Sequence, residues 1–278
     1  MPGRNAGAGA PLDSPPDVPA DEYALGMTTT PPPPPALPPP PVPPASPPPG
    51  WQPIPVAAAD RVRAAYEGRA RSDYIFTGPG LNIFLLLITC GIFGLYMFYQ
   101  LMRRDRDHLL RRYQLLEGAN AFAWERANAS GLAAELTPAF ERTAVHLESM
   151  RRQTTEFRDP AIWLLISLFA SGIAHIIGFV LIDQDLDTHD RTEGALESEL
   201  AEIYTRLGQA LPTPDPSRVK GKQNYGARIA VTIVTCGVYF YWWFYDMQVE
   251  GNRHLEANWP WEDALAGAVQ TMVTTTSP

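Results

Sequence analysis

The sequence contains only two cysteines, Cys90 and Cys236, in 278 residues. Both lie within apolar segments, so neither a disulfide framework nor a cysteine-based metal site is expected. Three common catalytic motifs, G-x-S-x-G, H-E-x-x-H and the P-loop, are also missing. The amino terminus has no basic stretch followed by an apolar core, so no signal peptide is expected. We therefore expect a non-enzymatic protein with no catalytic residues, no metal ligands and no cofactor.

Proline is scarce beyond residue 56, because 21 of the 29 prolines lie in residues 1–56. A segment of this composition cannot bury enough apolar surface to offset the entropy lost on ordering. Residues 1–72 are therefore predicted to form a disordered tail with a polyproline II bias. The tail is interpreted as a solvated tether, or alternatively as a ligand for a proline-recognition partner or a spacer through a cell-wall layer. The net charge of −8 gives no argument for binding nucleic acid.

Long apolar runs are confined to three segments, residues 81–102, 160–182 and 227–249. Each has 22 or 23 residues, and about 20 apolar residues suffice to cross a bilayer. Aromatic side chains crowd the third segment in the run YFYWWFY, a pattern typical of membrane interfaces. The sequence therefore predicts an all-α integral membrane protein with three membrane-inserted helical segments, which would lie in the cell membrane with the lipid bilayer as its partner.

The first and third segments are copies of each other. A shift of 146 residues places Thr89, Cys90 and Gly91 on Thr235, Cys236 and Gly237, Phe98 on Phe244, and His108 on His254. A shift of 81 residues gives a weaker match to the second segment, with Cys90 and Gly91 on Ser171 and Gly172, Phe98 on Phe179, and His108 on His189. The pattern predicts three degenerate units, each an apolar segment with a small-residue break followed by a polar helix.

The motifs TCGIFGLYMFY and TCGVYFYWWFY carry a resemblance to a known family. They are similar to the signature of the bacterial membrane family catalogued as domain of unknown function 4234. The resemblance covers roughly residues 78–110 and 224–258, whereas the middle unit has neither the cysteine nor the aromatic run. It implies membrane insertion and no particular activity.

The small residue before each glycine has two interpretations. It is a close-packing notch in a single span, or the turn of a re-entrant hairpin. Single spans place the arginine-rich loop 103–159 in the cytoplasm and put the tail and residues 183–226 outside. Hairpins place every polar part in the cytoplasm. The usual behaviour of long apolar segments favours single spans, although the charges flanking the third segment favour hairpins.

The expected domain order follows from these segments. The first unit is predicted over residues 78–128, and an antiparallel helical pair is expected from helices at 104–128 and 138–158. The remaining parts are the second unit at 138–211, with a further polar helix at 186–209, a linker at 212–226, the third unit at 227–258 and a C-terminal tail at 259–278. The amphipathic stripes of these helices are interpreted as intramolecular core or as a surface for self-association.

Four histidines are candidate functional residues. His108, His189 and His254 occupy one position of the three units, and three imidazoles can bind a metal ion. The short ligand spacing H-x-x-x-H is missing, which favours interfacial histidines instead. His175 lies inside an apolar segment, where an ionisable group suggests function. We expect a membrane-anchored helical scaffold or interaction platform, with a small channel or transporter subunit as the alternative.

Overall fold

The computed structural model describes residues 57–156, 158–216, 218, 221 and 223–275, and every regular element among them is an α-helix. The elements are α1 (Ala58–Glu67), α2 (Arg69–Ser72), α3 (Pro79–Ile88), α4 (Ile92–Ala129), α5 (Ala133–Thr155), α6 (Pro160–Arg206), α7 (Tyr225–Val234) and α8 (Val238–Thr274). The predicted all-α class is therefore confirmed. The proline-rich residues 1–56, and with them any proline-recognition site, lie outside the described residues.

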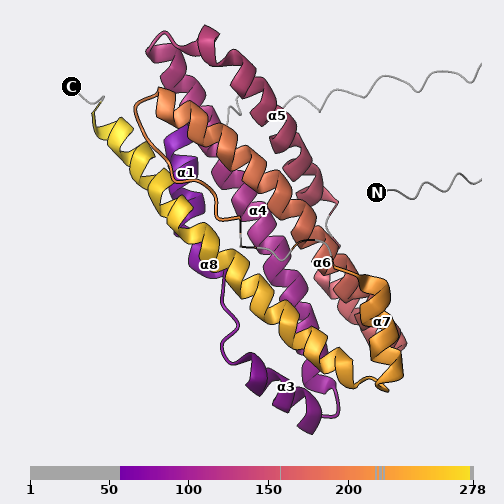
Figure 1. Cartoon of the computed structure of the whole chain (residues 1–278). Coiled ribbons are helices and arrows are strands. Elements are labelled where there is room, and N and C mark those ends of the chain that lie inside the picture. The colour runs from indigo at the N-terminus through magenta and orange to yellow at the C-terminus, as the bar shows by residue number, and fades with distance from the viewer. Residues whose placement is uncertain (1–56, 157, 217, 219–220, 222, 276–278) are drawn as a thin grey trace, which may run out of the picture. The chain divides into compact units, whose positions relative to one another are not determined.

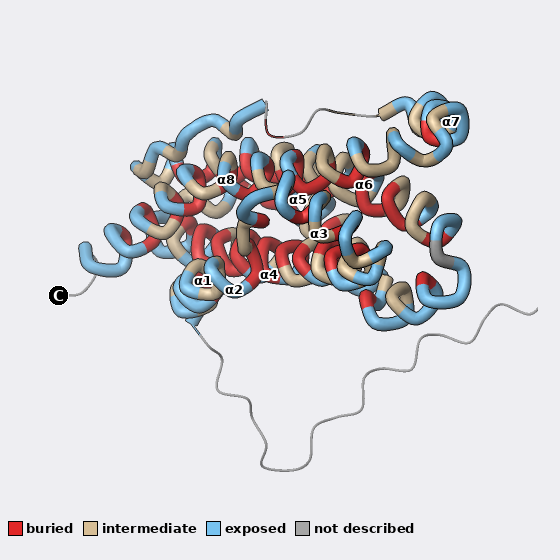
Figure 2. The backbone as a smooth tube through the Cα atoms, turned by 90° about the horizontal axis from the view of Figure 1, so that it is seen from below, coloured by how far each residue is buried: buried red, intermediate tan, exposed pale blue. Residues whose placement is uncertain are grey.

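Helices α4, α6 and α8 run side by side in the same direction and form the centre of the bundle (Figure 1). Helix α5 packs on α4 and α6, while α1 packs on α4 and α8. The buried faces of the long helices point towards each other, and their outer faces are exposed (Figure 2). This division matches the expected amphipathic stripes, which here form intramolecular core. The predicted antiparallel pair of polar helices is present as α4 and α5.

Residues related by the shifts of 81 and 146 meet inside the bundle in successive layers. The aromatic layer contains Phe98, Phe179 and Phe244, with ring centroids 6.0 Å apart for the first two and 5.6 Å for the last two. Two further buried layers follow the same shifts, Leu101 with Ile182 and Met247, and Leu115 with Leu196 and Trp261. The residues of successive layers recur at intervals of three or four along each helix, which is the spacing of a coiled-coil seam. The packing therefore supports the weaker match of the middle unit.

The Thr-Cys-Gly motif is a turn between two helices. Helix α3 ends at Ile88, and the amides of Cys90 and Gly91 donate to the carbonyls of Leu87 and Leu86, which closes a Schellman motif. Thr89 Oγ1 donates to the Leu85 carbonyl at 2.7 Å and accepts from the Phe93 amide at 3.0 Å, joining the two helices. Cys90 has φ +50° and Gly91 has φ +92°, so both lie in the left-handed region.

The second copy of the motif has the same geometry. Thr235 Oγ1 donates to the Val231 carbonyl at 2.8 Å and accepts from the Tyr239 amide at 3.0 Å. Cys236 has φ +48° and Gly237 has φ +89°. In the middle unit, by contrast, the backbone at positions 171 and 172 continues within the unbroken helix α6. The chain therefore turns at two of the three small-residue breaks, and the third is an uninterrupted helix.

The prediction of an integral membrane protein with three membrane-inserted segments is wrong. Of the helices that the structure describes, none is both long enough and apolar enough to cross a membrane. In two of the three segments the turn divides the apolar run into two helices. The helices before the turns, α3 and α7, have only 10 residues each. A helix of that length spans about 15 Å, half the hydrocarbon core. The predicted multi-pass location and the cytoplasmic placement of loop 103–159 depended on membrane-spanning segments, so they are wrong as well.

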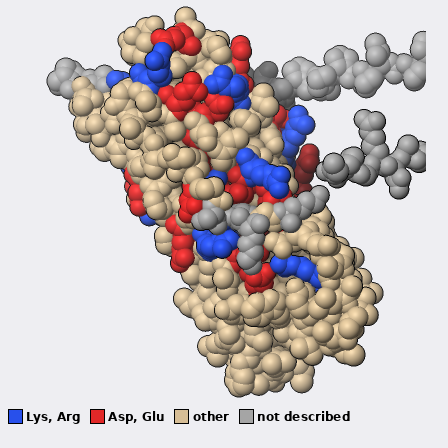
Figure 3. Space-filling view, in the orientation of Figure 1, with Lys and Arg blue, Asp and Glu red and all other residues tan. Residues whose placement is uncertain are grey.

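The apolar segments instead form an exposed part of the bundle. Large apolar side chains that are more than half exposed include Phe84, Ile92, Phe169, Ile173, Val234 and Val238. The view in Figure 3 shows this end without charged side chains, whereas acidic and basic groups gather over the rest of the bundle. The charged groups visible on this face therefore lie away from the apolar end.

Several predicted boundaries also need correction. Residues 58–72 were assigned to the tail but form α1 and α2, because Val62 and Ala65 pack into the core. Residues 259–274 were assigned to the C-terminal tail but continue α8, where Leu265 is fully buried. Pro138 lies inside α5 instead of starting it, because α5 begins at Ala133. The predicted linker 212–226 holds the start of α7, and the segment 160–182 and the helix 186–209 are one helix.

The left-handed turn gives a paired prediction on stability. Gly91→Ala is expected to lower the free energy of unfolding by about 1 kcal/mol, because a Cβ is strained at φ +92° even though no atom lies near it. Gly172→Ala is the matched control, since this glycine lies inside α6 with open space around it. Alanine should stabilise that helix by up to about 1 kcal/mol. Denaturant unfolding of both variants tests the pair, and equal effects would contradict the turn.

Candidate metal centre

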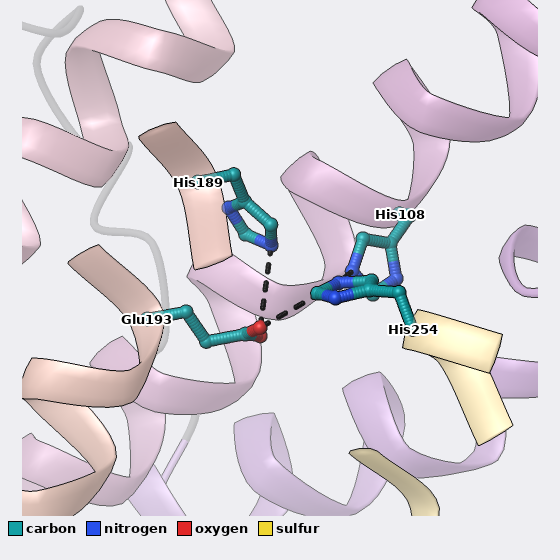
Figure 4. Close-up of side chains that lie close together, drawn as sticks. All are labelled: His108, His189, Glu193 and His254. Carbon is teal, nitrogen blue, oxygen red and sulfur yellow. Dashed lines mark hydrogen bonds and ion pairs between the residues drawn. The ribbon is translucent and has the colours of Figure 1, made fainter. Parts of the chain in front are cut away.

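Three histidines and one glutamate meet where the three long helices pack together (Figure 4). His108 comes from α4, His189 and Glu193 come from successive turns of α6, and His254 comes from α8. All four side chains are at most 3% exposed. The layer is built by the repeat, since the histidines are the equivalent residues of the three units. Helix α6 adds the carboxylate because residues four apart share one face of a helix.

Three distances within this His3Glu cluster are close to those between ligands of one coordination sphere. His108 Nε2 lies 3.2 Å from His254 Nε2. Glu193 Oε2 lies 3.5 Å from His189 Nε2 and 3.7 Å from His254 Nε2. Tetrahedral ligands bound at 2.0–2.1 Å are about 3.3–3.4 Å apart. One ligand atom from each residue lies within 4.8 Å of all the others. The longest of these distances would have to shorten by about 1.5 Å for the four atoms to surround one tetrahedral ion.

A carboxylate holds His108 in the orientation that a metal ligand needs. Asp73, which follows α2 and is 2% exposed, lies 3.1 Å from His108 Nδ1. A proton on Nδ1 is donated to Asp73, and this leaves the lone pair of Nε2 pointing into the cluster. On His254, Nδ1 lies 3.6 Å from Asp190 Oδ1, which places a second carboxylate behind a second imidazole. Outer carboxylates of this kind fix the tautomer of histidine ligands in metal sites.

His189 has no hydrogen-bond partner for either ring nitrogen among the described residues, although it is 1% exposed. A buried polar group without a partner costs about 1–3 kcal/mol. A histidine that served only to fill the core would be expected to satisfy at least one nitrogen. A bound cation would supply the missing partner for Nε2, since that atom already faces Glu193.

The charges around the cluster favour a cation. Five carboxylates form one connected network with three buried guanidiniums: Asp73, Asp190, Glu193, Glu197 and Glu262 with Arg111, Arg112 and Arg218. At the edge of this network Arg69 also approaches Glu262, but it pairs more closely with Asp263. With the carboxylates ionised, the network carries an excess of two negative charges. A divalent cation would balance that excess inside the bundle.

The protonation states of the cluster suit metal binding. Burial lowers the pKa of His108, although the Asp73 carboxylate acts in the opposite direction. Burial also lowers the pKa of His254 well below its usual value. Burial alone would raise the pKa of Glu193, but Arg112 and other positive charges nearby hold it well below the usual range. Neutral imidazoles and an ionised carboxylate are the forms that bind metal ions.

The other candidates from the sequence lie elsewhere. His175 lies on α6 beside Phe98, with ring centroids 4.8 Å apart, and it is 14 residues before His189, about 21 Å along the helix. The motif residues Thr89–Gly91 and Thr235–Gly237 form the two turns and contribute nothing to the cluster.

Sequence reasoning missed Glu193. The sequence has no H-x-x-x-H spacing, but α6 carries the related pattern H-x-x-x-E at His189 and Glu193. The repeat gave a second signal, because Glu193 aligns with Arg112 and Asn258, each one turn after a cluster histidine. These three residues form the next layer, in which Asn258 Nδ2 donates to Glu193 Oε2 at 3.1 Å.

The outer carboxylate gives a prediction on affinity. Asp73→Asn is expected to weaken metal binding about ten-fold or more, because the amide is a poorer acceptor for the Nδ1 proton of His108. Asp263→Asn is the matched control, since this aspartate pairs with Arg69 at the surface and is 52% exposed. Competition with a chelator of known affinity measures both. Equal affinities for the two variants would show that Asp73 does not orient a ligand.

Comparison with known proteins adds no relative. No protein-family model, no curated protein and no solved structure matches this chain. The resemblance to domain of unknown function 4234 therefore stays a prediction, and the candidate site stands on its own geometry.

Proposed function

We propose that this protein is a helical platform that binds one divalent transition-metal ion through His108, His189, His254 and Glu193. The observation that carries the proposal is the convergence of three buried imidazoles and one carboxylate at distances close to those of tetrahedral ligands. Three separate helices supply the ligands, so a bound ion would tie the three repeat units together. We propose no enzymatic activity for it.

The donor set favours Zn2+. Imidazole nitrogens and a carboxylate oxygen are ligands that zinc uses in tetrahedral sites. Sulfur donors play no part, because Cys90 and Cys236 are exposed in the two turns, far along α4 and α8 from the cluster histidines. Ca2+ and Mg2+ prefer oxygen ligands, and this set has a single carboxylate. Cu2+ and Ni2+ also bind imidazole, so a tetrahedral geometry is what selects zinc.

The role proposed for the ion is structural. The cluster lies midway along the seam of α4, α6 and α8, where it replaces a layer of apolar side chains. A ligand that binds only the folded protein stabilises it by about 2.7 kcal/mol at a hundred times its dissociation constant. Metal binding would therefore order the platform on which partners or a second copy of the chain assemble.

The experiment uses the full chain after removal of metal with a chelator. Calorimetric titration with Zn2+ should show one ion bound per chain, and thermal unfolding should shift to higher temperature with zinc. The matched control is His146→Ala, because His146 lies on α5 outside the cluster. This variant should bind zinc like the wild type. Failure of the wild-type chain to bind one equivalent, or binding that survives loss of the cluster histidines, would overturn the proposal.

A further inference from the structure

A small cavity adjoins the metal ligands. Its volume is about 20 Å³, room for one water molecule or ion. All three cluster histidines line it, and its other lining residues are Asp105, Leu109, Asp185, Leu186, Gly251 and Leu255. The cavity lies next to the histidine layer, since Asp105, Leu186 and Gly251 occupy the equivalent positions of the next layer and all three line it.

A much larger groove opens beside the cavity. It has a volume of about 790 Å³ and lies between α4, α5 and α6. Leu109 and Asp185 line both spaces, so they form the boundary between them. Carboxylates recur along the groove, where Glu148, Glu156 and Asp185 lie. The groove therefore leads from the surface to Leu109 and Asp185, and the cavity and the histidines lie directly behind these two residues.

An ion pair stands at this boundary. Arg158, between α5 and α6, pairs with Asp185, and both side chains are 32% exposed. The pair holds the Asp185 carboxylate towards the groove and neutralises it. When the pair opens, Asp185 becomes a free carboxylate between solvent and the small cavity.

The ligands on the inner side point to a cation as the occupant. His189 lines the cavity, and neither of its ring nitrogens has a hydrogen-bond partner among the described residues. Asp105 and Asp185 add two carboxylates to the same lining. Nitrogen lone pairs next to carboxylates attract a positive ion and repel an anion.

We propose that this groove is the entry port of the metal centre, with Asp185 as a transient outer ligand for a hydrated divalent cation and Arg158 as the side chain that closes the port. The inference rests on the proposed metal binding at the His3Glu cluster. Transfer is ligand exchange without any redox change. The cation releases water molecules to the groove, and the Asp185 oxygen and then the imidazole nitrogens take their places.

The test measures rates as well as affinity, with Zn2+ as the probe. Stopped-flow mixing of the metal-free full chain with Zn2+ gives the uptake rate, and a chromophoric chelator gives the loss rate. Arg158→Ala should accelerate both rates about five-fold, because opening no longer breaks the ion pair, while the dissociation constant stays unchanged. Asp185→Asn should slow uptake by about three-fold or more, since the outer carboxylate is lost.

The two variants are expected to change the uptake rate in opposite directions, and this distinguishes a port from a structural ion pair. Loss of either partner of a structural pair would change the rate in the same direction. Arg151→Ala is the matched control, since Arg151 pairs with Glu148 near the same helix end without contacting Asp185. Wild-type rates in both Arg158→Ala and Asp185→Asn would overturn the port while leaving the metal centre intact. A wild-type chain that takes up no Zn2+ would overturn both.

Discussion

Replacing His189 with alanine is expected to lower the affinity for Zn2+ by more than about a hundred-fold, since loss of an outer partner alone costs 10–100-fold. The substitution removes one of four ligands from a site buried between α4, α6 and α8. No other histidine, cysteine or carboxylate joins the group within the described residues, so none replaces it. Chelator competition measures the affinity directly.

The same variant should lose the stabilisation that zinc gives the wild-type chain. At a zinc concentration a hundred times the wild-type dissociation constant, that stabilisation is about 2.7 kcal/mol, and it falls to less than about 0.5 kcal/mol when the affinity drops a hundred-fold. His146→Ala controls for the loss of a histidine elsewhere in the bundle. A His189→Ala chain that still shows the full zinc-dependent rise in melting temperature would mean that the ion binds at another place.

Replacing Arg112 with methionine is expected to lower the free energy of unfolding by about 3–5 kcal/mol. Arg112 is fully buried and pairs with Glu193, Glu197 and Glu262, so methionine leaves these carboxylates with less positive charge inside the core. The three nitrogens of the planar guanidinium each donate to a different one of these carboxylates. Denaturant unfolding of the metal-free chain gives the free energy without a contribution from zinc.

Arg151→Met is the matched control for this second prediction. Arg151 also pairs with a glutamate, Glu148, but its side chain is 50% exposed. The substitution should change the free energy of unfolding by less than about 0.5 kcal/mol, as is usual for surface sites. If Arg112→Met costs no more than the control, the carboxylates around the cluster are not held ionised, and the charge argument for a cation fails.

The internal repeat predicted more of the site than any motif did. Aligning the units placed His108, His189 and His254 at one position, and in the bundle that position is a single buried layer. The same alignment placed Phe98 on Phe179, which lie in contact three layers away. Equivalent residues of parallel packed helices meet at the same height, so a repeat of helical units reports contacts between segments far apart in the sequence.

Two parts of the site could not be read from sequence. Asp73 lies outside the repeated units and reaches His108 only because the chain after α2 packs against α4. Arg218 lies in the predicted linker, yet it is 3% exposed and pairs with Glu197. Contacts of this kind depend on how connecting segments fold back, and neither periodicity nor spacing carries that information.

For two of the three segments the membrane prediction failed for a local reason. Length and apolarity treat each segment as one straight helix, but the backbone at Cys90 and Cys236 adopts left-handed conformations that end the first arm after 10 residues. The turn of the hairpin alternative is present at these two positions, but the membrane insertion that both alternatives assumed is contradicted. The middle unit shows the limit of motif reasoning, because its Gly172 lies within a continuous helix where the other two units turn.

X-ray absorption at the zinc edge of the full chain loaded with one equivalent of Zn2+ is the most direct test of the metal centre. The account predicts a first shell of nitrogen and oxygen only, with bonds of about 2.0–2.1 Å and outer scattering from three imidazoles. The pattern should be lost in His189→Ala and retained in His146→Ala. A sulfur ligand, fewer than three imidazoles, or a spectrum of hydrated zinc would contradict it.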